Sequence, residues 1–256
     1  MNINDFVKAN AVALYLGTNA SQQTGNAGKT GLAAQPGFQK AEKRIQAQVD
    51  VATAQLSSFG KLKSALSDVQ TVGQALAAVS GSSSSKPAAQ KTALGQFVAA
   101  YNTAIDSAKA AASVTGDGAA TQSALRTIKD LLHAVNAKNG SQSVLGQLGL
   151  DLGANGKLVL DANAFEAAQK ADPIAVAQGL GALGQQVSAA STQELAMDGH
   201  LGLYLSSLAQ RASILKSQQG MLASLGLYSS SNQGSSTGGA YDFGLAAYRK
   251  SLQSGA

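Results

Sequence analysis

The chain has 256 residues with a net charge of +5; 13% are charged and 5% aromatic, and it has neither cysteine nor tryptophan. The missing cysteine excludes disulfides, thiolate zinc sites and cysteine nucleophiles. The lysines and arginines are scattered and not interleaved with aromatic residues, which argues against a nucleic-acid partner. Small side chains at helical spacing favour long, closely packed helices instead.

The first 40 residues are predicted to form a flexible N-terminal arm, because residues 17–37 are rich in glycine, serine, threonine, asparagine and glutamine. The N-terminus lacks the cationic start, apolar core and cleavage site of a signal peptide. Any export is therefore expected to use an uncleaved N-terminus. No apolar run approaches the roughly 20 residues of a membrane span, so no membrane partner is expected.

A long helix is predicted to begin near Phe38 and to form an N-terminal coiled-coil helix over residues 41–80. Its apolar residues recur every three or four positions, as in a coiled-coil seam. Ordinary amphipathic packing inside one chain gives the same spacing, so both interpretations stay open. The residues chosen for helix pairing here are Ile45, Val49, Leu56, Phe59, Leu62 and Leu66.

A serine-rich linker at residues 81–91 precedes a predicted helical core at residues 92–190. The first two helices are expected at about 88–113 and 119–137, the second closed by Asn139-Gly140. A short helix is expected at about 163–171, after Asp161 or Asn163 as cap. Asp172-Pro173 then begins another helix, with the aspartate as cap and the proline in the first turn.

Residues 148–161 are predicted to form a β-hairpin within this helical core. Leu148, Leu150 and Leu152 alternate with small or polar residues, and the alternation resumes at residues 158–160. Between the two runs, Asn155-Gly156 supplies the pair of residues that tolerates positive φ in a tight turn.

The last long helix is predicted to run from about Gly184 to Tyr228, loosened around Asp198-Gly199. Residues 191–228 are assigned to a C-terminal coiled-coil helix that pairs antiparallel with the N-terminal one, and residues 229–256 to a flexible tail. Gln219 is a polar position within this pattern. The fold class is mainly α, and the pairing residues chosen here are Leu201, Leu205, Leu208, Leu215 and Leu222.

The sequence offers no convincing catalytic or cofactor site. Residues 179–184 match G-x-G-x-x-G by letter, but a dinucleotide site needs a preceding strand and a following acidic residue within a βαβ unit. His133 and His200, the two histidines, lie on different predicted helices with no spaced carboxylate, and are interpreted as surface or helix-end residues. No enzymatic activity, cofactor or metal is expected.

Several segments, taken in order, resemble the flagellar hook-associated protein 2 family, the filament caps. Phe97-Val-Ala-Ala-Tyr-Asn102 resembles the family's F-V-x-x-Y-N helix, and Ser123–Ile128 resembles the helix after it. Residues 148–161 and then Asp172-Pro-Ile-Ala-Val176 are similar to its hairpin and its D-P-x-x-V helix. Residues 41–80 also resemble its N-terminal helix. The chain departs from the family in one respect, because only residues 80–91 stand where typical caps carry large β-rich outer domains.

The resemblance implies a structural protein at the tip of a bacterial flagellum, outside the cell, that retains exported flagellin and promotes its polymerisation. It implies a ring of identical subunits, commonly five, with export through the flagellar type III apparatus and a possible export chaperone. Flagellin and the hook-filament junction proteins would be its partners. The alternative is another type III-exported axial or junction protein related to flagellin.

Overall fold

The computed structural model describes residues 35–81, 87–114, 118–136, 138–139 and 142–231. The described residues are mainly α-helical, as predicted. They fall into two compact units, a central unit of residues 48–214 and a terminal unit drawn from residues 1–47 and 215–256. Each unit is described by itself, and the predicted N-terminal arm up to residue 34 and the tail beyond residue 231 lie outside the described residues.

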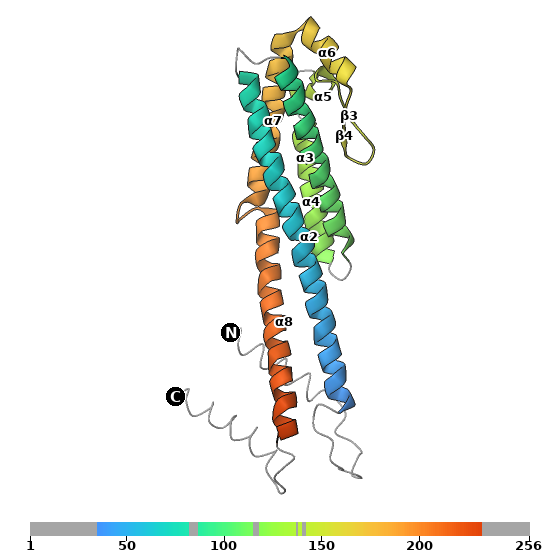
Figure 1. The fold of residues 1–256 in the computed structure, drawn as a ribbon, viewed down its shortest axis with the longest axis vertical. Coiled ribbons are helices and arrows are strands. Elements are labelled where there is room, and N and C mark those ends of the chain that lie inside the picture. Colours follow the sequence, from blue (N-terminus) through green and yellow to red (C-terminus); the bar gives the residue numbers. More distant parts are fainter. Residues whose placement is uncertain (1–34, 82–86, 115–117, 137, 140–141, 232–256) are drawn as a thin grey trace, which may run out of the picture. The chain divides into compact units, whose positions relative to one another are not determined.

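Helices make up most of the described chain, with two short antiparallel strand pairs near its middle, of which β3 and β4 are seen in Figure 1. The first three helices in the figure are α2 (Pro36–Gly81), α3 (Pro87–Ser113) and α4 (Gly118–Val135). Strands β1 (Lys138–Asn139) and β2 (Gln142–Ser143), helix α5 (Val144–Gln147), and strands β3 (Leu150–Leu152) and β4 (Leu158–Leu160) follow. The chain continues through α6 (Ala162–Ala171), α7 (Pro173–Leu195) and α8 (His200–Ser231).

The core of the central unit is a bundle built from α2, α3, α4, α7 and the start of α8. On α3 the buried residues Leu94, Phe97, Tyr101 and Ile105 recur every three or four positions and form one apolar face. Phe97 and Tyr101 stack with ring centroids 6.3 Å apart. Burial raises the pKa of the Tyr101 hydroxyl above its ordinary value. Two of the residues that carry the family resemblance are thus central to the core.

The predicted hairpin forms from β3 and β4, which pair with Leu150 opposite Leu160 and Leu152 opposite Leu158. Leu150 and Leu158 are buried whereas Val159 is exposed, which is the alternation that the sequence predicts. The turn has three residues and not two. The Gly153 amide donates to the Lys157 carbonyl at 2.9 Å, and this bond encloses residues 154–156. Gly156 takes the left-handed conformation there, with φ of 77°.

Asn102 of α3 fixes this hairpin to the bundle. Its Nδ2 donates to the Leu158 carbonyl at 2.9 Å, and its Oδ1 accepts from the Leu158 amide at 2.8 Å. Two further contacts join the same helix to the turn: Lys157 donates to the Asp106 carboxylate at 2.7 Å, and Lys109 to the Asn155 carbonyl at 2.5 Å. The asparagine that ends the F-V-x-x-Y-N segment therefore positions the hairpin.

Replacing Asn102 with leucine is expected to lower the free energy of unfolding by roughly 1–3 kcal/mol, because the amide and carbonyl of Leu158 would both lose a partner in a half-buried place. Urea unfolding followed by circular dichroism gives the loss, and amide hydrogen exchange shows whether it is centred on residues 150–160. Thr103→Leu is the control, since Thr103 is exposed and bonds only within its own helix, to the Ala99 carbonyl. Equal loss in both variants would contradict the role of Asn102.

Aspartate caps begin α6 and α7 as predicted. The Asp161 carboxylate accepts from the amides of Asn163 and Ala164, so Asp161 and not Asn163 is the cap of α6. The Asp172 carboxylate accepts from the amides of Ile174 and Ala175, with Pro173 in the first turn of α7.

Several boundaries differ from the prediction. Helix α2 begins at Pro36, inside the predicted flexible arm of residues 1–40, and Leu148 caps the end of α5 and does not lie on the first hairpin strand, which begins at Leu150. The expected helix from Gly184 to Tyr228 is two helices, because the chain leaves helical geometry at residues 196–199; residues 184–195 belong to α7. Helix α4 ends at Val135, two residues early. Asn139 does not form the predicted C-terminal cap of α4. It lies on β1, where it pairs with Gln142 of β2 in a short antiparallel strand pair.

Candidate functional site

The predicted pairing residues divide between the two units and differ in burial. Phe59, Leu62, Leu66 and Leu201 lie in the continuous apolar core of the central unit. The others that are buried are Val49, Leu208 and Leu215, while Ile45, Leu56, Leu205 and Leu222 are half-buried. Packing within the chain therefore explains the first four, and any role of the eleven between copies stays a prediction.

Antiparallel packing of α2 against α7 and α8 in the central unit rests on contacts spread along the helices. Phe59 and Tyr204 have ring centroids 4.5 Å apart. Further along α2, Gln70 donates to the Thr192 hydroxyl at 2.8 Å, and Gly73 meets Gly184. Along these contacts the residue number rises on α2, while the residue number of the contacted partner falls from α8 to α7. Helix α2 therefore runs antiparallel to α7 and α8. In the terminal unit, Gln219 donates a hydrogen bond to Gln46.

The closest approach in this packing is between glycines. A Cβ atom built on Gly184 would lie 2.4 Å from the Gly73 carbonyl oxygen and 2.8 Å from the Ala77 amide nitrogen. Gly184 ends the G-x-G-x-x-G run, and the whole run lies inside α7. Its last glycine allows the backbone of α2 to approach closely. The run lies within a helix, as predicted, and does not follow a strand as a dinucleotide site requires.

Gln55 is the polar exception on this face of α2. Its side chain is fully buried, yet neither Nε2 nor Oε1 has a hydrogen-bond partner among the described residues. A buried amide without partners costs stability, and single polar residues in helix-pairing cores are known to fix register at such a cost.

Replacing Gln55 with leucine is expected to raise the free energy of unfolding by about 1 kcal/mol, because an unpartnered amide gives way to an apolar side chain of comparable size. Thermal and urea unfolding measure the change. Gln74→Leu is the matched control, since Gln74 lies on the same helix but is exposed and should change stability little. A loss of stability in Gln55→Leu would mean that the amide is satisfied in solution.

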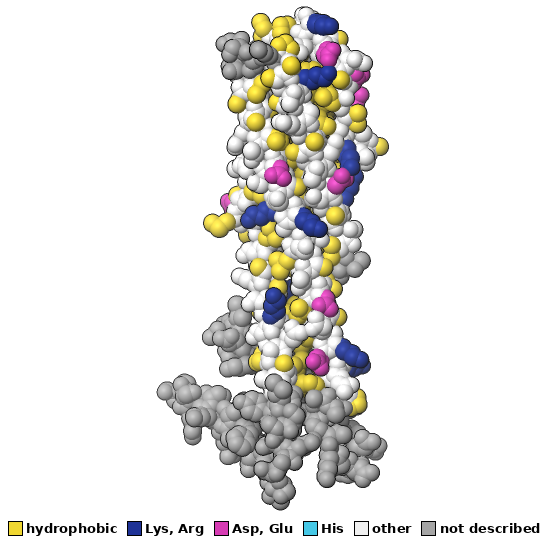
Figure 2. Space-filling view, in the orientation of Figure 1, with side chains coloured by type: hydrophobic (Ala, Val, Ile, Leu, Met, Phe, Trp, Pro, Cys, Tyr) yellow, Lys and Arg dark blue, Asp and Glu magenta, His cyan; other side chains and the backbone are white. Residues whose placement is uncertain are grey.

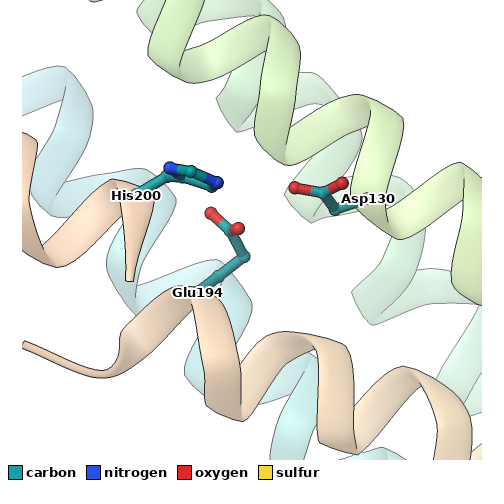
Figure 3. Close-up of side chains that lie close together, drawn as sticks. All are labelled: Asp130, Glu194 and His200. Carbon is teal, nitrogen blue, oxygen red and sulfur yellow. The ribbon is translucent and has the colours of Figure 1, made fainter. Parts of the chain in front are cut away.

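A polar cluster lies at the junction of α7 and α8 (Figure 3). Asp130 comes from α4, Glu194 from the last turn of α7, and His200 begins α8. One ligand atom from each lies within 4.8 Å of those from the other two. The expectation that His200 has no carboxylate near it is wrong, because the break at residues 196–199 lets the chain turn and brings Glu194 beside it. Asp130 is close only through the packing of α4, which no local sequence signal reveals.

Glu194 is the buried member of this cluster, with 4% of its surface exposed. Burial raises the pKa of its carboxyl; Asp130 raises it further, while the Thr127 hydroxyl and His200 lower it. The Thr127 hydroxyl lies 3.0 Å from Glu194 Oε2. Asp130 is half-buried and His200 exposed, so the cluster opens from a buried carboxylate toward solvent.

Beside the same junction, α8 presents an apolar hollow of about 350 Å³ lined by residues that include Lys63, Leu201 and Leu205. Met197 and Leu203 also line it and are 91% and 57% exposed. Leu201 and Leu205, two of the predicted pairing residues, thus line this hollow. In Figure 2 the charged side chains on the visible face stand singly or in small groups and form no large basic patch.

Helix by helix, the described part of the chain contains no segment with both the length and the hydrophobicity needed to cross a bilayer.

Comparison with models of protein families gives a match. Residues 84–232, more than half of the chain, match the family model described as the C-terminus of flagellar hook-associated protein 2. The matched range begins just before α3 and takes in the hairpin, α6, α7 and all of α8. No curated protein and no solved structure matches the chain.

Proposed function

Because this chain belongs to the flagellar hook-associated protein 2 family, we propose that it acts as a filament cap, retaining exported flagellin at the tip and promoting its polymerisation. The family is one of structural flagellar proteins and not of enzymes. The observation that carries the proposal is the match over residues 84–232, which takes in α3 to α8 with the hairpin between them and leaves only α2 outside.

The proposed cap is a short one. Helix α2 ends at Gly81 and α3 begins at Pro87, so five residues separate the two helices where the resemblance leads one to expect large outer domains. We infer that capping by this protein depends on the helical bundle and on the parts of α2 and α8 that belong to the terminal unit. An outer plate built from that insertion would be absent.

The proposed mechanism is mechanical. Copies of the chain form a ring at the distal end of the filament, and the ends of α2 and α8 reach toward the lumen. With 5% aromatic residues, the chain offers mainly aliphatic side chains for helix pairing, and each such contact contributes only a little attraction. Helix ends held by such contacts can dock, release and dock again as flagellin subunits insert beneath them.

Partners and location follow from the same proposal. The chain would contact other copies of itself, flagellin and the hook-filament junction proteins, and an export chaperone could hold it before secretion. It would leave the cell through the type III apparatus with its N-terminus uncleaved and stay outside the cell on the flagellum. These are expectations from the family.

Deletion of the gene tests the proposed function. The expected result is short or absent filaments by electron microscopy together with monomeric flagellin in the medium, both reversed by the wild-type gene. Normal filaments with clean medium would contradict capping. Gold labelling of a tagged chain separates the alternative, because a tip signal supports a cap whereas a signal along the shaft or at the hook would assign the chain to the axial or junction proteins.

A further inference from the structure

The polar cluster of Asp130, Glu194 and His200 has the donor set of a metal site. Two carboxylates and one imidazole, from three different helices, point toward a common space (Figure 3). Carboxylate oxygen and imidazole nitrogen together are ligands of Zn²⁺, whereas Ca²⁺ and Mg²⁺ prefer oxygen alone.

Burial of one of the two carboxylates adds to the case for a cation. Glu194 is 96% buried and is directed into the cluster, where the charged groups that face it are Asp130 and His200. The Thr127 hydroxyl provides one hydrogen bond but no positive charge. Two carboxylates held this close repel each other, and burying one of them is costly unless a proton shared between them or a cation neutralises the pair; a bound Zn²⁺ ion would displace that proton.

We propose that Asp130, Glu194 and His200 form a three-ligand site for one Zn²⁺ ion at the junction of α7 and α8, with water completing the coordination. Ligand bonds of about 2.0–2.2 Å in a tetrahedral site place ligand atoms about 3.4 Å apart. The three atoms here lie within 4.8 Å, so the cluster must contract by up to about 1.4 Å. His200 can supply that movement, because it is exposed and is the first residue of α8.

The ion would act as a clip across the turn between the helices. Glu194 precedes residues 196–199 and His200 follows them, while Asp130 is anchored on α4. The turn is already tight, since a Cβ atom on Gly199 would lie 2.1 Å from the Gln193 carbonyl oxygen. A bound ion would fix the direction in which α8 leaves α7. This goes beyond the proposed capping function and does not depend on it.

Metal titration of the purified full chain tests the site. After removal of metal with EDTA and dialysis, isothermal titration with ZnCl₂ is expected to give one ion per chain and to raise the thermal unfolding midpoint. Asp130→Asn, Glu194→Gln and His200→Gln should each weaken binding at least about tenfold, because loss of even an outer-shell partner of a metal ligand costs 10–100-fold. Co²⁺ should give the visible absorption bands of a four-coordinate ion.

His133→Gln is the matched control, because His133 is an exposed histidine on α4 only three residues from Asp130. Its affinity for Zn²⁺ should equal that of the wild type. Circular dichroism of the metal-free variants shows that each is folded, which keeps lost binding distinct from unfolding. Absence of Zn²⁺ binding, unchanged affinity in His200→Gln, or an equal loss in His133→Gln would overturn the proposal.

Discussion

The double variant Leu208→Asp/Leu215→Asp is expected to abolish filament assembly and motility. Leu208 is 2% exposed and Leu215 is 7% exposed, so each aspartate would place a carboxylate where an apolar side chain is buried. An ionised carboxylate buried without a partner is strongly unfavourable, and the helix must expose it by moving away from its neighbours. The two residues lie in different units, so both parts of α8 are affected.

Swimming assays and electron microscopy of cells carrying the variant measure this effect. Leu203→Asp is the control on the same helix, because Leu203 is 57% exposed and an aspartate there meets solvent. Leu208→Met/Leu215→Met should keep function, since methionine conserves volume and polarity. Circular dichroism establishes whether the bundle stays helical in the aspartate variant. Filaments of normal length in that variant would refute a role for these residues in assembly.

Gly184→Ala is expected to lower the free energy of unfolding by roughly 3 kcal/mol, at the upper end of the usual cost of overpacking. The new methyl group would lie 2.4 Å from one backbone atom of α2 and 2.8 Å from another. Backbone atoms cannot rotate away as a side chain can, so the two helices must separate.

Gly60→Ala is expected to change the free energy of unfolding in the opposite direction. Gly60 lies on α2, and a Cβ atom there meets nothing within 4 Å. The same substitution should raise the free energy of unfolding by about 0.5–1 kcal/mol, because alanine is the better helix former. Urea unfolding of both variants measures the contrast. Stabilisation by Gly184→Ala would show that α2 and α7 do not cross closely in solution.

Local signals made the helices and the hairpin predictable. Asp161 and Asp172 reveal two helix starts because a cap bonds amides two and three residues ahead, within reach of sequence inspection. The alternation of apolar and polar residues at 148–160 is also a pattern between near neighbours in the sequence, and it predicts the hairpin. The turn was one residue longer than expected, because Asn155-Gly156 is compatible with more than one turn type.

Contacts between distant residues could not be predicted. Asn102 and Leu158 are 56 residues apart, so the asparagine was visible only as part of a family motif and not as the anchor of the hairpin. The cluster at the α7–α8 junction depends on the packing of Asp130 against residues more than 60 positions later. Glu194 and His200 lie on either side of Asp198-Gly199, where the sequence predicts that the helix is loosened but not that the chain turns and brings the two side chains together.

The bonds between Asn102 and Leu158 also bear on aggregation. A strand with unpaired amides and carbonyls is a template on which another chain can add, and β4 would present such an edge on the side away from β3. The side-chain amide of Asn102 occupies the positions that a third strand would take, donating to the carbonyl and accepting from the amide of Leu158. The hairpin is therefore closed at Leu158 by a single residue, and the strand of another chain cannot pair with Leu158 while Asn102 occupies those positions.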